Sequence, residues 1–301
     1  MPVKQTLRIG SRGSKLALWQ SNHIKEQLES LHEGLEVEIT IIKTKGDIIQ
    51  DVALSKIGDK GLFTKELEVA LLNEDVDLCV HSMKDMPTEI PEGLMLGPVP
   101  PRVCPLDALV APEGISSLDE LPKGARIGTG SLRRRAQLYA LEKGFELVEQ
   151  RGNLDTRMKR VENGELDAAI LAAAGIHRLG WKSRIAALID PEVMTPAVGQ
   201  GALALEMRIG DENTFDLCRP LGDDDTERCV EAERYIMRTL EGGCQIPIGA
   251  YAQLENGQLT TQAMVAAIDG SRVIRATHQT PEMVVEDLLS QGATEILASI
   301  R

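Results

Sequence analysis

The fold is decided by the stretch Leu7-Arg-Ile-Gly-Ser-Arg-Gly-Ser14 and the segment that follows it. Leu7 to Gly10 predicts a short strand that breaks into a Gly/Ser turn, and apolar residues spaced at helical intervals predict a helix over 15–31. The turn would bring Ser and Gly backbone amides to a helix N-terminus beside Arg12, an arrangement that suits an anion. It is not a P-loop, because the characteristic Gly-Lys-Ser/Thr ending is absent.

A second stretch, Ala125-Arg-Ile-Gly-Thr-Gly-Ser131, repeats this pattern, with Gly128 in the place of Gly10. Two further echoes follow in the same order, of 35–46 in 145–152 and of 76–80 in 166–171. Three echoes in order predict two similar α/β domains that face each other across a cleft. Strand carboxyl ends and helix N-termini would point into that cleft, which is where such folds bind ligands.

Two Pro/Gly-rich segments, 98–105 and 190–201, predict crossovers between these domains, and a strand over 202–206 is expected to return to the first domain. After Gly222 the pattern changes to a helix over 226–240, followed by hairpin signals and a helix from Pro281. We therefore expect an α/β protein whose first two domains flank a cleft, with a small α+β third domain. The expected boundaries are 1–101 with 198–220 for the first domain, 102–197 for the second and 221–301 for the third.

Composition excludes several classes of protein. The chain has 301 residues and 43% apolar residues, which suits a globular enzyme, while a net charge of −13 and 3% aromatic residues argue against general nucleic-acid binding. No apolar signal segment is visible, and the longest apolar run, 168–176, is too short to span a bilayer. Five cysteines without a C-x-x-C pair predict reduced thiols. We expect a cytoplasmic protein with neither nucleic-acid nor membrane partners and no metal site.

Six arginines share one kind of position. Each is expected at or just past a strand end, or in the first helical turn after it, where an open α/β sheet binds ligands. Planar guanidinium groups pair bidentately with carboxylate or phosphate, so the ligand should carry several anionic groups. Any one of them could be an ordinary surface cation, but six at equivalent places favour a binding site. These are Arg12, Arg133, Arg134, Arg151, Arg157 and Arg178.

Two more residues are candidates for the chemistry. Asp85 follows a strand predicted over 76–81, and nearby cations would keep it ionised, which suits stabilising a cationic intermediate or relaying a proton to a leaving amine. Alternatively, Asp85 could have a purely structural role as a helix cap or as a salt-bridge partner. Cys244 follows a helix end, where the helix dipole would raise the pKa of a thiol. It is therefore either a small buried residue or a covalent anchor.

These residues leave two other functions open. A non-catalytic module could bind a small polyanion in the same cleft, with Cys244 as an ordinary buried thiol. A cysteine hydrolase could pair Cys244 with His81 or His177, although the setting at a helix end and the lack of a nucleophile-elbow pattern count against it.

Long motifs along nearly the whole chain resemble one known family. They are RIGSRGSKLALWQ, KTKGD, GKGLFTKELEVALL, DLCVHSMKDMP, GTGSLRRRAQL, RGNLDTR, AAAGIHRLG, PAVGQGAL and LEGGCQIPIGAY, in this order. The chain is similar to the hydroxymethylbilane synthases, also called porphobilinogen deaminases. The resemblance implies two domains like those of a periplasmic binding protein, a third domain, and a monomer.

The resemblance also implies a dipyrromethane cofactor attached through a thioether to Cys244. The enzyme would condense four porphobilinogen molecules head to tail onto that primer, release an ammonia from each, and hydrolyse off hydroxymethylbilane. Asp85 matches the family's catalytic aspartate, which steadies an azafulvenium-like cation, and 47–60 matches a flexible active-site loop. Positions that match the family's cofactor contacts are Ser14, Ser82, Lys84, Asp85, Thr129, Ser131, Arg133, Arg134, Arg151 and Gly152. Those that match its substrate contacts are Arg12, Arg151, Arg157 and Arg178.

The sequence departs from the family pattern at four positions. Where an E-R-x-D-P-R-D-like segment is usual, Pro101, Cys104 and Leu106 replace a Glu, an Asp and an Arg, while Arg102 and Asp107 are retained. Gly130 stands where Ser is common. These departures predict altered hinge salt bridges and the loss of one cofactor hydrogen bond.

Charge counting bears on the mechanism. A two-pyrrole primer extended by four pyrroles would carry twelve carboxylates, about twice the number of the six arginines. One fixed set of cations cannot pair with all of them. We therefore predict that the growing chain moves past a single condensing centre at Asp85.

Overall fold

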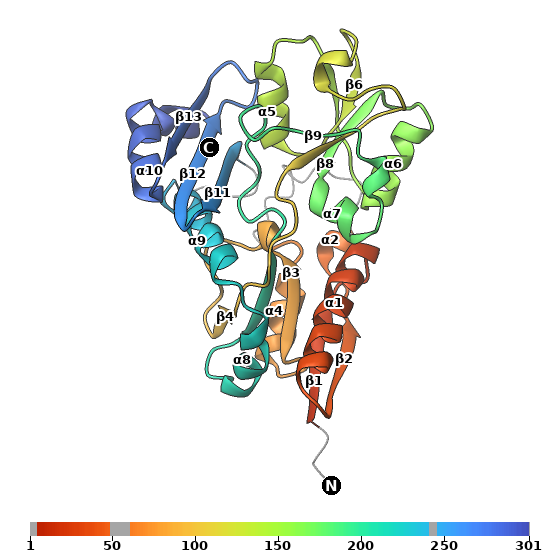
Figure 1. Cartoon of the computed structure of the whole chain (residues 1–301), viewed down its shortest axis with the longest axis vertical. Helices are drawn as coiled ribbons and strands as arrows, with labels where there is room; N and C mark the ends of the chain where they lie inside the picture. Colours follow the sequence, from red (N-terminus) through yellow and green to blue (C-terminus); the bar gives the residue numbers. More distant parts are fainter. Residues whose placement is uncertain (1–4, 49–60, 241–245, 301) are drawn as a thin grey trace. The chain divides into compact units, whose positions relative to one another are not determined.

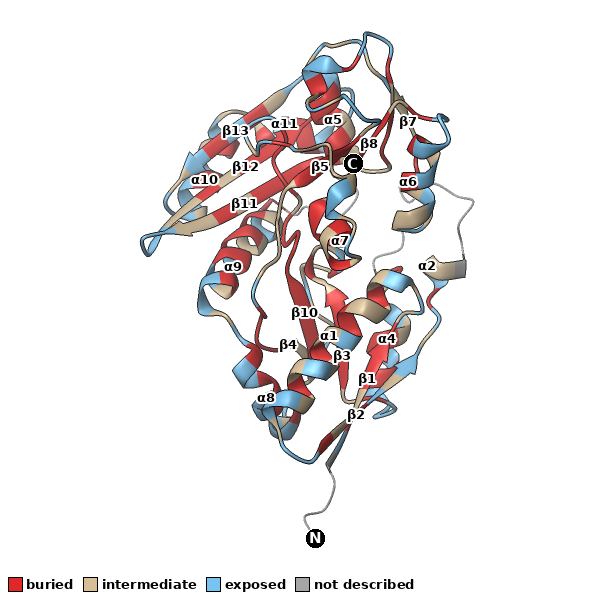
Figure 2. Cartoon of the chain, turned by 45° about the vertical axis from the view of Figure 1, so that its right-hand side comes forward, coloured by how far each residue is buried: buried red, intermediate tan, exposed pale blue. Residues whose placement is uncertain are grey.

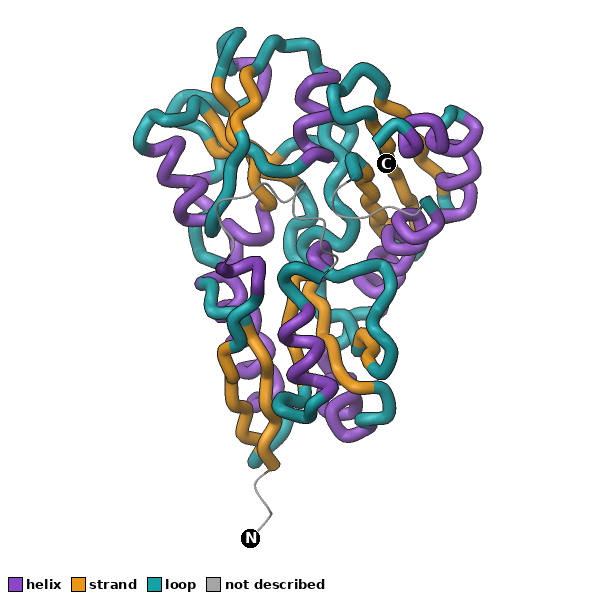
Figure 3. Tube along the Cα trace, turned by 180° about the vertical axis from the view of Figure 1, so that it is seen from behind, coloured by secondary structure: helices purple, strands orange, loops and turns teal. Residues whose placement is uncertain are grey.

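The computed structural model describes residues 5–48, 61–240 and 246–300 (Figure 1). These residues form two compact units. The first unit contains the described residues up to 102 together with 202–228, and the second unit contains 103–201 and the described residues from 229 onward. In the tube view the strands gather into three separate groups, each with its own helices (Figure 3).

The first unit is built on a five-stranded sheet with the order β2-β1-β3-β10-β4. Its strands are β1 (Gln5–Ser11), β2 (Leu35–Ile41), β3 (Leu78–Ser82), β4 (Leu94–Leu96) and β10 (Leu203–Arg208). β1 runs parallel to β2 and β3, whereas β10 runs antiparallel to β3 and β4. The strand expected after the second crossover therefore does return to the first sheet.

The helices of the first unit follow the predicted pattern with small shifts. They are α1 (Lys15–Leu31), α2 (Lys45–Ile48), α4 (Lys65–Leu72) and α8 (Glu212–Cys218), with one-turn 3-10 helices η1 (Met83–Asp85) and η4 (Arg219–Leu221). α4 begins at Lys65, after a turn at Gly61 (φ +86°) in which the Lys65 N–H donates to the Gly61 carbonyl. α1 packs Ile24 and Leu28, both fully buried, against the sheet. Each such side chain contributes about 1.5–3 kcal/mol.

The second unit repeats this arrangement in a sheet with the order β7-β6-β8-β5-β9. Its strands are β5 (Asp107–Val110), β6 (Arg126–Gly128), β7 (Glu146–Val148), β8 (Ala168–Ala172) and β9 (Ala187–Leu188). Its helices are α5 (Leu132–Ala140), α6 (Leu154–Glu162) and α7 (Ala173–Arg178), with 3-10 helices η2 (Leu118–Glu120) and η3 (Lys182–Arg184). β6 is parallel to β7 and β8, and β5 is antiparallel to β8 and β9. Figure 2 shows most strand residues of both sheets as buried.

One pair of charged residues occurs at the same place in both sheets. In the first, the Asp77 carboxylate accepts hydrogen bonds from the backbone N–H of Arg8 (2.9 Å) and from its Nε and Nη2 (3.0 and 2.7 Å). In the second, Asp167 accepts from the backbone N–H of Arg126 (2.7 Å) and from its Nε and Nη2 (both 3.2 Å). The predicted internal repeat is thus a repeat of structure as well as of sequence.

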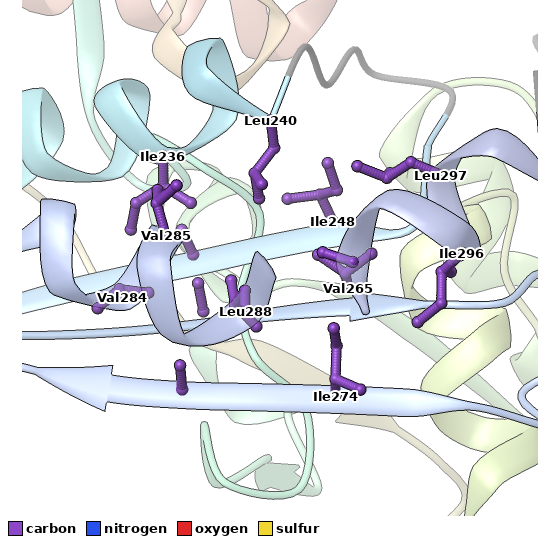
Figure 4. Close-up of a cluster of buried hydrophobic side chains, with 14 of the residues drawn as sticks. Ile236, Leu240, Ile248, Val265, Ile274, Val284, Val285, Leu288, Ile296 and Leu297 are labelled. Carbon is purple, nitrogen blue, oxygen red and sulfur yellow. The ribbon is translucent and has the colours of Figure 1, made fainter. Parts of the chain in front are cut away.

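The second unit also holds a small antiparallel sheet with the order β11-β12-β13. Its elements are β11 (Ile248–Glu255), β12 (Gln258–Ala266), β13 (Val273–His278), α10 (Pro281–Ser290) and α11 (Ala293–Ala298). Both predicted hairpins are present, because β12 pairs with β11 and with β13. Figure 4 shows the apolar core between this sheet and its helices, with Val265 and Leu288 fully buried.

The helix predicted over 226–240 is α9 (Asp224–Thr239), and the boundary between the two units falls after Arg228, inside it. It begins early because the Asp223 carboxylate accepts a hydrogen bond from the Thr226 backbone N–H at 2.8 Å and so caps the first turn. Within the described residues, no helix combines the length and the apolar character needed to cross a membrane. The fold class is α/β, as the sequence predicts, with a small α+β part at the C-terminal end.

Candidate active site

In the first unit, the candidate residues gather at one edge of the sheet. β1 and β3 are parallel neighbours, so their carboxyl ends meet at that edge. Arg12 and Ser14 follow β1, Ser82 ends β3, and Lys84 and Asp85 lie in η1 directly after it. The strand-end positions predicted for Arg12 and Asp85 are therefore found in the structure, and Ser14, Ser82 and Lys84 lie at the same edge.

Asp85 is exposed because its neighbours are anchored. Met83 and Met86 are each only 2% exposed, so the η1 turn is pinned from both sides of the Lys84-Asp85 pair. The Met83 backbone N–H donates to the Ala202 carbonyl (3.0 Å), and the Met86 N–H donates to the Met83 carbonyl (3.1 Å). A one-turn helix thus holds the Asp85 carboxylate out into solvent at the end of a buried strand.

Ser82 is positioned by a residue that sequence reasoning missed. Gln20 Nε2 donates a hydrogen bond to Ser82 Oγ at 2.8 Å, and Gln20 is 2% exposed. The signal was present in the sequence, because Gln20 is a large polar residue on the buried face of α1, beside Ile24 and Leu28. A buried amide of this kind requires a partner.

Arg12 is held by Asp47 and by an aromatic ring. Its Nη2 lies 2.5 Å from Asp47 Oδ1, and its guanidinium carbon lies 4.2 Å from the centre of the Phe63 ring. Burial by itself would raise the pKa of Asp47, but hydrogen bonds and charge from Arg12, with hydrogen bonds from Thr44, lower the pKa overall. The Arg12 guanidinium is therefore fixed in one orientation beside the carboxyl end of β1.

In the second unit, the candidate residues again lie at carboxyl ends of parallel strands. Thr129 to Arg134 follow β6, 151–157 follow β7, and Arg178 follows β8. Ser131 caps α5, its Oγ accepting from the Arg134 N–H, as Ser14 caps α1 by accepting from the Ala17 N–H. One placement was wrong: Arg178 is the last residue of α7 and not in its first turn, because Ala172 already caps the helix.

Arg133 and Arg134 are 4% and 5% exposed and share one buried carboxylate. Arg133 Nη1 donates to Asp107 Oδ2 at 2.8 Å, and Arg134 Nη2 and Nε donate to Asp107 Oδ1 at 2.7 and 3.0 Å. Burial alone would raise the pKa of Asp107, but the charges and hydrogen bonds of the two arginines lower it far below its ordinary value. Sequence reasoning noted Asp107 only as a retained motif residue and did not connect it with this pair.

Two other arginines of the second unit have buried donor atoms without partners. The Nε and Nη2 of Arg151 and the Nε of Arg178 are buried and make no hydrogen bond to the described residues. Arg178 is 6% exposed, its Nη2 donates to the Gly201 carbonyl at 2.8 Å, and burial lowers its pKa to about 10, so it stays protonated at neutral pH. Buried donors of this kind need acceptors, and a ligand carboxylate would supply them.

The remaining residues shape the loop after β7. Arg157 Nε donates to the Gly152 carbonyl at 2.9 Å, and Gly152 has a positive φ of +92° that favours glycine. Gly130 is explained by its surroundings, because a Cβ there would lie 2.6 Å from the Gln150 carbonyl oxygen. The loop that contains Gln150 thus approaches position 130 too closely for a side chain, which explains why Gly130 stands where the family commonly has Ser.

The other departures fall in two places. In the first unit Pro101 is exposed, and next to it the N–H of the retained Arg102 donates to Thr226 Oγ1 at 3.1 Å. In the second unit, the Leu106 carbonyl accepts from the Ala173 N–H at 3.1 Å, while Cys104 is half-buried against an apolar cluster. Cys244 and 49–60, which include most of the predicted active-site loop, lie outside the described residues.

Each unit is an α/β body with cations at the carboxyl edge of its sheet, and comparison with known proteins shows the family. Residues 7–216 match the family model described as porphobilinogen deaminase, dipyromethane cofactor binding domain, and 227–297 match porphobilinogen deaminase, C-terminal domain. The chain belongs to the porphobilinogen deaminase family.

Individual relatives are similar over their full length. The porphobilinogen deaminase of Desulforamulus reducens is 50% identical, covering 99% of this chain and 99% of its own. That of Syntrophobacter fumaroxidans is 48% identical, covering 98% of each. Among solved structures, the probable amino-acid ABC transporter extracellular-binding protein ytmK from Bacillus subtilis covers 73% of this chain and 91% of its own, with 15% identity and a TM-score of 0.45.

The chain is therefore a transferase of tetrapyrrole biosynthesis that condenses porphobilinogen and uses a dipyrromethane cofactor. The residues present fit that cofactor, because its acetate and propionate groups require several guanidinium donors, and Arg151 and Arg178 carry buried donors that no described residue accepts from. Family membership sets aside the cysteine-hydrolase alternative. Its candidate His81 is 6% exposed, with Nε2 lying 3.0 Å from Glu206 Oε2.

Proposed function

We propose that Asp85 is the condensing centre of this enzyme and that Cys244 carries its dipyrromethane cofactor through a thioether. The observation that supports the first assignment is the exposed Asp85 carboxylate, presented on a turn that Met83 and Met86 anchor. The second assignment is supported by the motif LEGGCQIPIGAY around Cys244.

Asp85 suits a reaction in which an amino group leaves a carbon attached to a pyrrole ring. Positive charge develops on the substrate as the C–N bond breaks, and a carboxylate beside it stabilises that charge. When the new C–C bond forms, the pyrrole carbon that attacks must lose its proton, and the same carboxylate can accept it. Four such condensations release four ammonia molecules, and water then frees hydroxymethylbilane.

The arginines bind the carboxylates in this proposal. Arg12 holds a substrate carboxylate near Asp85, since both follow neighbouring parallel strands. In the second unit, Arg151 and Arg178 have the donors to bind further carboxylates, and Arg157 completes the substrate set. The cofactor contacts that we propose, besides Cys244, are Ser14, Ser82, Lys84, Asp85, Thr129, Ser131, Arg133, Arg134, Arg151 and Gly152.

One experiment tests both assignments, combining intact-mass measurement with an assay for ammonia released from porphobilinogen. The native protein should exceed its sequence mass by one dipyrromethane, and Cys244→Ser should not. Asp85→Asn should keep the added mass, yet release ammonia about 100- to 1,000-fold more slowly, because it loses the charge that stabilises the transition state.

Two matched variants serve as controls. Cys104→Ser changes a half-buried cysteine elsewhere and should keep the added mass, and Glu89→Gln removes an exposed carboxylate just past η1 and should keep the rate. Added mass on Cys244→Ser would remove Cys244 as the anchor, and near-normal ammonia release by Asp85→Asn would remove Asp85 from the chemistry. A native protein that binds porphobilinogen reversibly and releases no ammonia would favour a binding module.

The compartment and the oligomeric state are proposed on resemblance alone. We propose a cytoplasmic monomer whose growing product moves past Asp85 while the cofactor stays attached. Sedimentation of the loaded protein at several concentrations tests the first part, and a mass that doubles at micromolar concentration would contradict it.

A further inference from the structure

The carboxylate of Asp107 is the centre of a buried ion triad. The side chain is 0% exposed, and both of its oxygens accept hydrogen bonds from guanidinium groups, Oδ2 from Arg133 and Oδ1 from Arg134. Gln200 Nε2 adds a further donor to Oδ1 at 3.0 Å and also binds the Pro105 carbonyl at 2.7 Å. Four donors therefore fix this carboxylate, namely Arg133 Nη1, Arg134 Nε and Nη2, and Gln200 Nε2. The carboxylate in turn fixes both arginines.

The corresponding place in the first sheet has no ions. Counting from the cap serines, the second and third residues of α5 are Arg133 and Arg134, whereas those of α1 are Leu16 and Ala17. In the backbone register, Asp107 lies opposite the last residue of β8. The buried Leu203 lies opposite the last residue of β3 and is therefore the equivalent of Asp107 in the first sheet. The framework thus forms with three apolar residues at these positions.

A buried ion triad is a poor way to stabilise a fold, since apolar residues of similar volume are often equal or better. Two adjacent guanidinium groups also repel each other, and the repulsion from Arg134 is one cause of the lowered pKa of Arg133, after burial. Asp107 offsets that repulsion and leaves the triad with one net positive charge. This ion triad is present in one of the two sheets and replaced by apolar residues in the other. Its net positive charge therefore points to a functional role in the second sheet.

The directions of the hydrogen bonds show which arginine is available. Arg134 also donates to the Ile170 carbonyl at 3.0 Å and to Gln200 Oε1 at 3.5 Å, so most of its donors are used inside the protein. Arg133 uses only Nη1, which donates to Asp107 and to the Thr195 carbonyl at 2.6 Å. Its Nε and Nη2 donate to no described residue, and these two atoms form the edge of a guanidinium that binds a carboxylate bidentately.

We propose that Asp107 is a positioning residue for cofactor binding. By holding Nη1 of Arg133 and clamping Arg134 behind it, Asp107 presents the Nε and Nη2 edge of Arg133 to a carboxylate of the dipyrromethane. This inference rests on the proposed function. Asp107 touches neither substrate nor cofactor, and it acts through the orientation and charge of its two partners.

The test follows the acquisition of the cofactor mass with time, by intact-mass measurement, when cofactor-free protein is incubated with porphobilinogen. Asp107→Asn keeps the volume but loses the charge, and it should load about 100-fold more slowly, because a misplaced binding group loses orientation. Asp107→Glu restores the charge and should recover part of the rate. Any variant that does load should show a raised KM with a nearly normal kcat.

Asp77 provides a matched control, because its carboxylate also pairs with two arginines, Arg8 at 2.7 Å and Arg208 at 3.2 Å, but precedes β3 instead of lying at a carboxyl edge. Asp77→Asn should be destabilised and should load at the wild-type rate. A folded Asp107→Asn protein that loads as fast as the wild type would overturn the inference.

A failure to fold and a failure of the proposed function can each be distinguished from a failure of the Asp107 proposal. If Asp107→Asn does not fold, Arg134→Ala is compared with Arg134→Ala combined with Asp107→Leu, so that both variants lack Arg134 and keep Arg133. Equal loading by the two variants would overturn the proposal, and slower loading by the double variant would support it. A wild-type protein that gains no mass from porphobilinogen would contradict the proposed function itself.

Discussion

The two five-stranded sheets share a framework but differ in the charges at their carboxyl edges. Both have the same series of parallel and antiparallel pairings across the sheet, the same Arg–Asp pair and a serine cap on the equivalent helix. At the first edge an exposed carboxylate, Asp85, follows β3, the parallel neighbour of the strand that Arg12 follows. At the second, Asp107 is buried under two arginines, and Arg151 and Arg178 carry buried donors that have no partner in the part of the chain that the structure describes.

This difference shows how one framework serves two tasks. The strands, the caps and the Arg–Asp pairs recur in both copies and make up the shared framework. The residues that differ lie at strand ends and in the first helical turn, where a side chain changes the ligand site without changing the sheet. In the proposed function, one copy supplies the carboxylate for chemistry, and the other supplies cations for a polyanionic chain.

The shared Arg–Asp pair gives the largest expected effect. Asp77→Ala should lower the free energy of unfolding by about 2 kcal/mol, because it leaves the hydrogen-bond donors of Arg8 and Arg208 without their acceptor. Asp167→Ala should cost less than about 1 kcal/mol, because the Arg126 and Asp167 side chains are 41% and 40% exposed. Urea unfolding of both variants measures the difference, and equal losses would show that exposure does not distinguish the two copies.

The same variants predict a pH dependence. Burial would raise the pKa of Asp77, but the hydrogen bonds of Arg8 and Arg208 lower it below the ordinary value of 3.8. A lowered pKa stabilises the fold above pH 3.8, and this stabilisation is lost as the pH falls through the folded-state value. The gap between wild type and Asp77→Ala should therefore be full at pH 7 and shrink below pH 3.8, and a gap that widens there would contradict the assignment.

The glycine before each cap serine gives an intermediate effect. A Cβ at Gly130 would lie 2.6 Å from the Gln150 carbonyl oxygen, so Gly130→Ala should cost about 1–3 kcal/mol and slow cofactor loading. A Cβ at Gly13 would meet only a methyl group of Ile41 at 3.4 Å, so Gly13→Ala should change stability by less than about 0.5 kcal/mol. Thermal unfolding of both variants checks this, and a neutral Gly130→Ala would mean that the loop after β7 moves aside easily.

The cap serines give the smallest expected effect and sharpen the comparison. Ser14→Ala and Ser131→Ala should each cost about 0.5–1 kcal/mol, because each removes one acceptor from a first-turn N–H. Their functional effects should differ, since only α5 carries the arginines that Asp107 holds. The test compares the cofactor-loading rates of the two variants under conditions in which they are equally stable. Equal slowing of both variants would show that the two caps affect cofactor loading in the same way.

Much of the framework could be predicted from the sequence. Strand and helix periodicity located β1, α1 and β3 to within about two residues, and the Asn-Gly and Asp-Gly turns located both C-terminal hairpins. The internal repeat predicted two equivalent sheets, and the motifs predicted the family. These signals are local, because caps, turns and alternation act between residues a few positions apart.

The missed contacts join residues far apart in the chain. Asp107 meets Arg133 from 26 positions away, and Arg12 meets Asp47 from 35 positions away. A charge pattern gives the number of carboxylates and guanidinium groups but not which of them meet, because that choice depends on strand register and burial.

The sequence by itself determined the class of fold, the repeat, the family and the residues that follow each strand. Only the tertiary structure decided that two of the predicted ligand arginines are held by a buried carboxylate, that Gln20 holds Ser82, and that Gly130 has no room for a side chain. The physical reason is that the cost of burying a charge or an added atom depends on what packs around it.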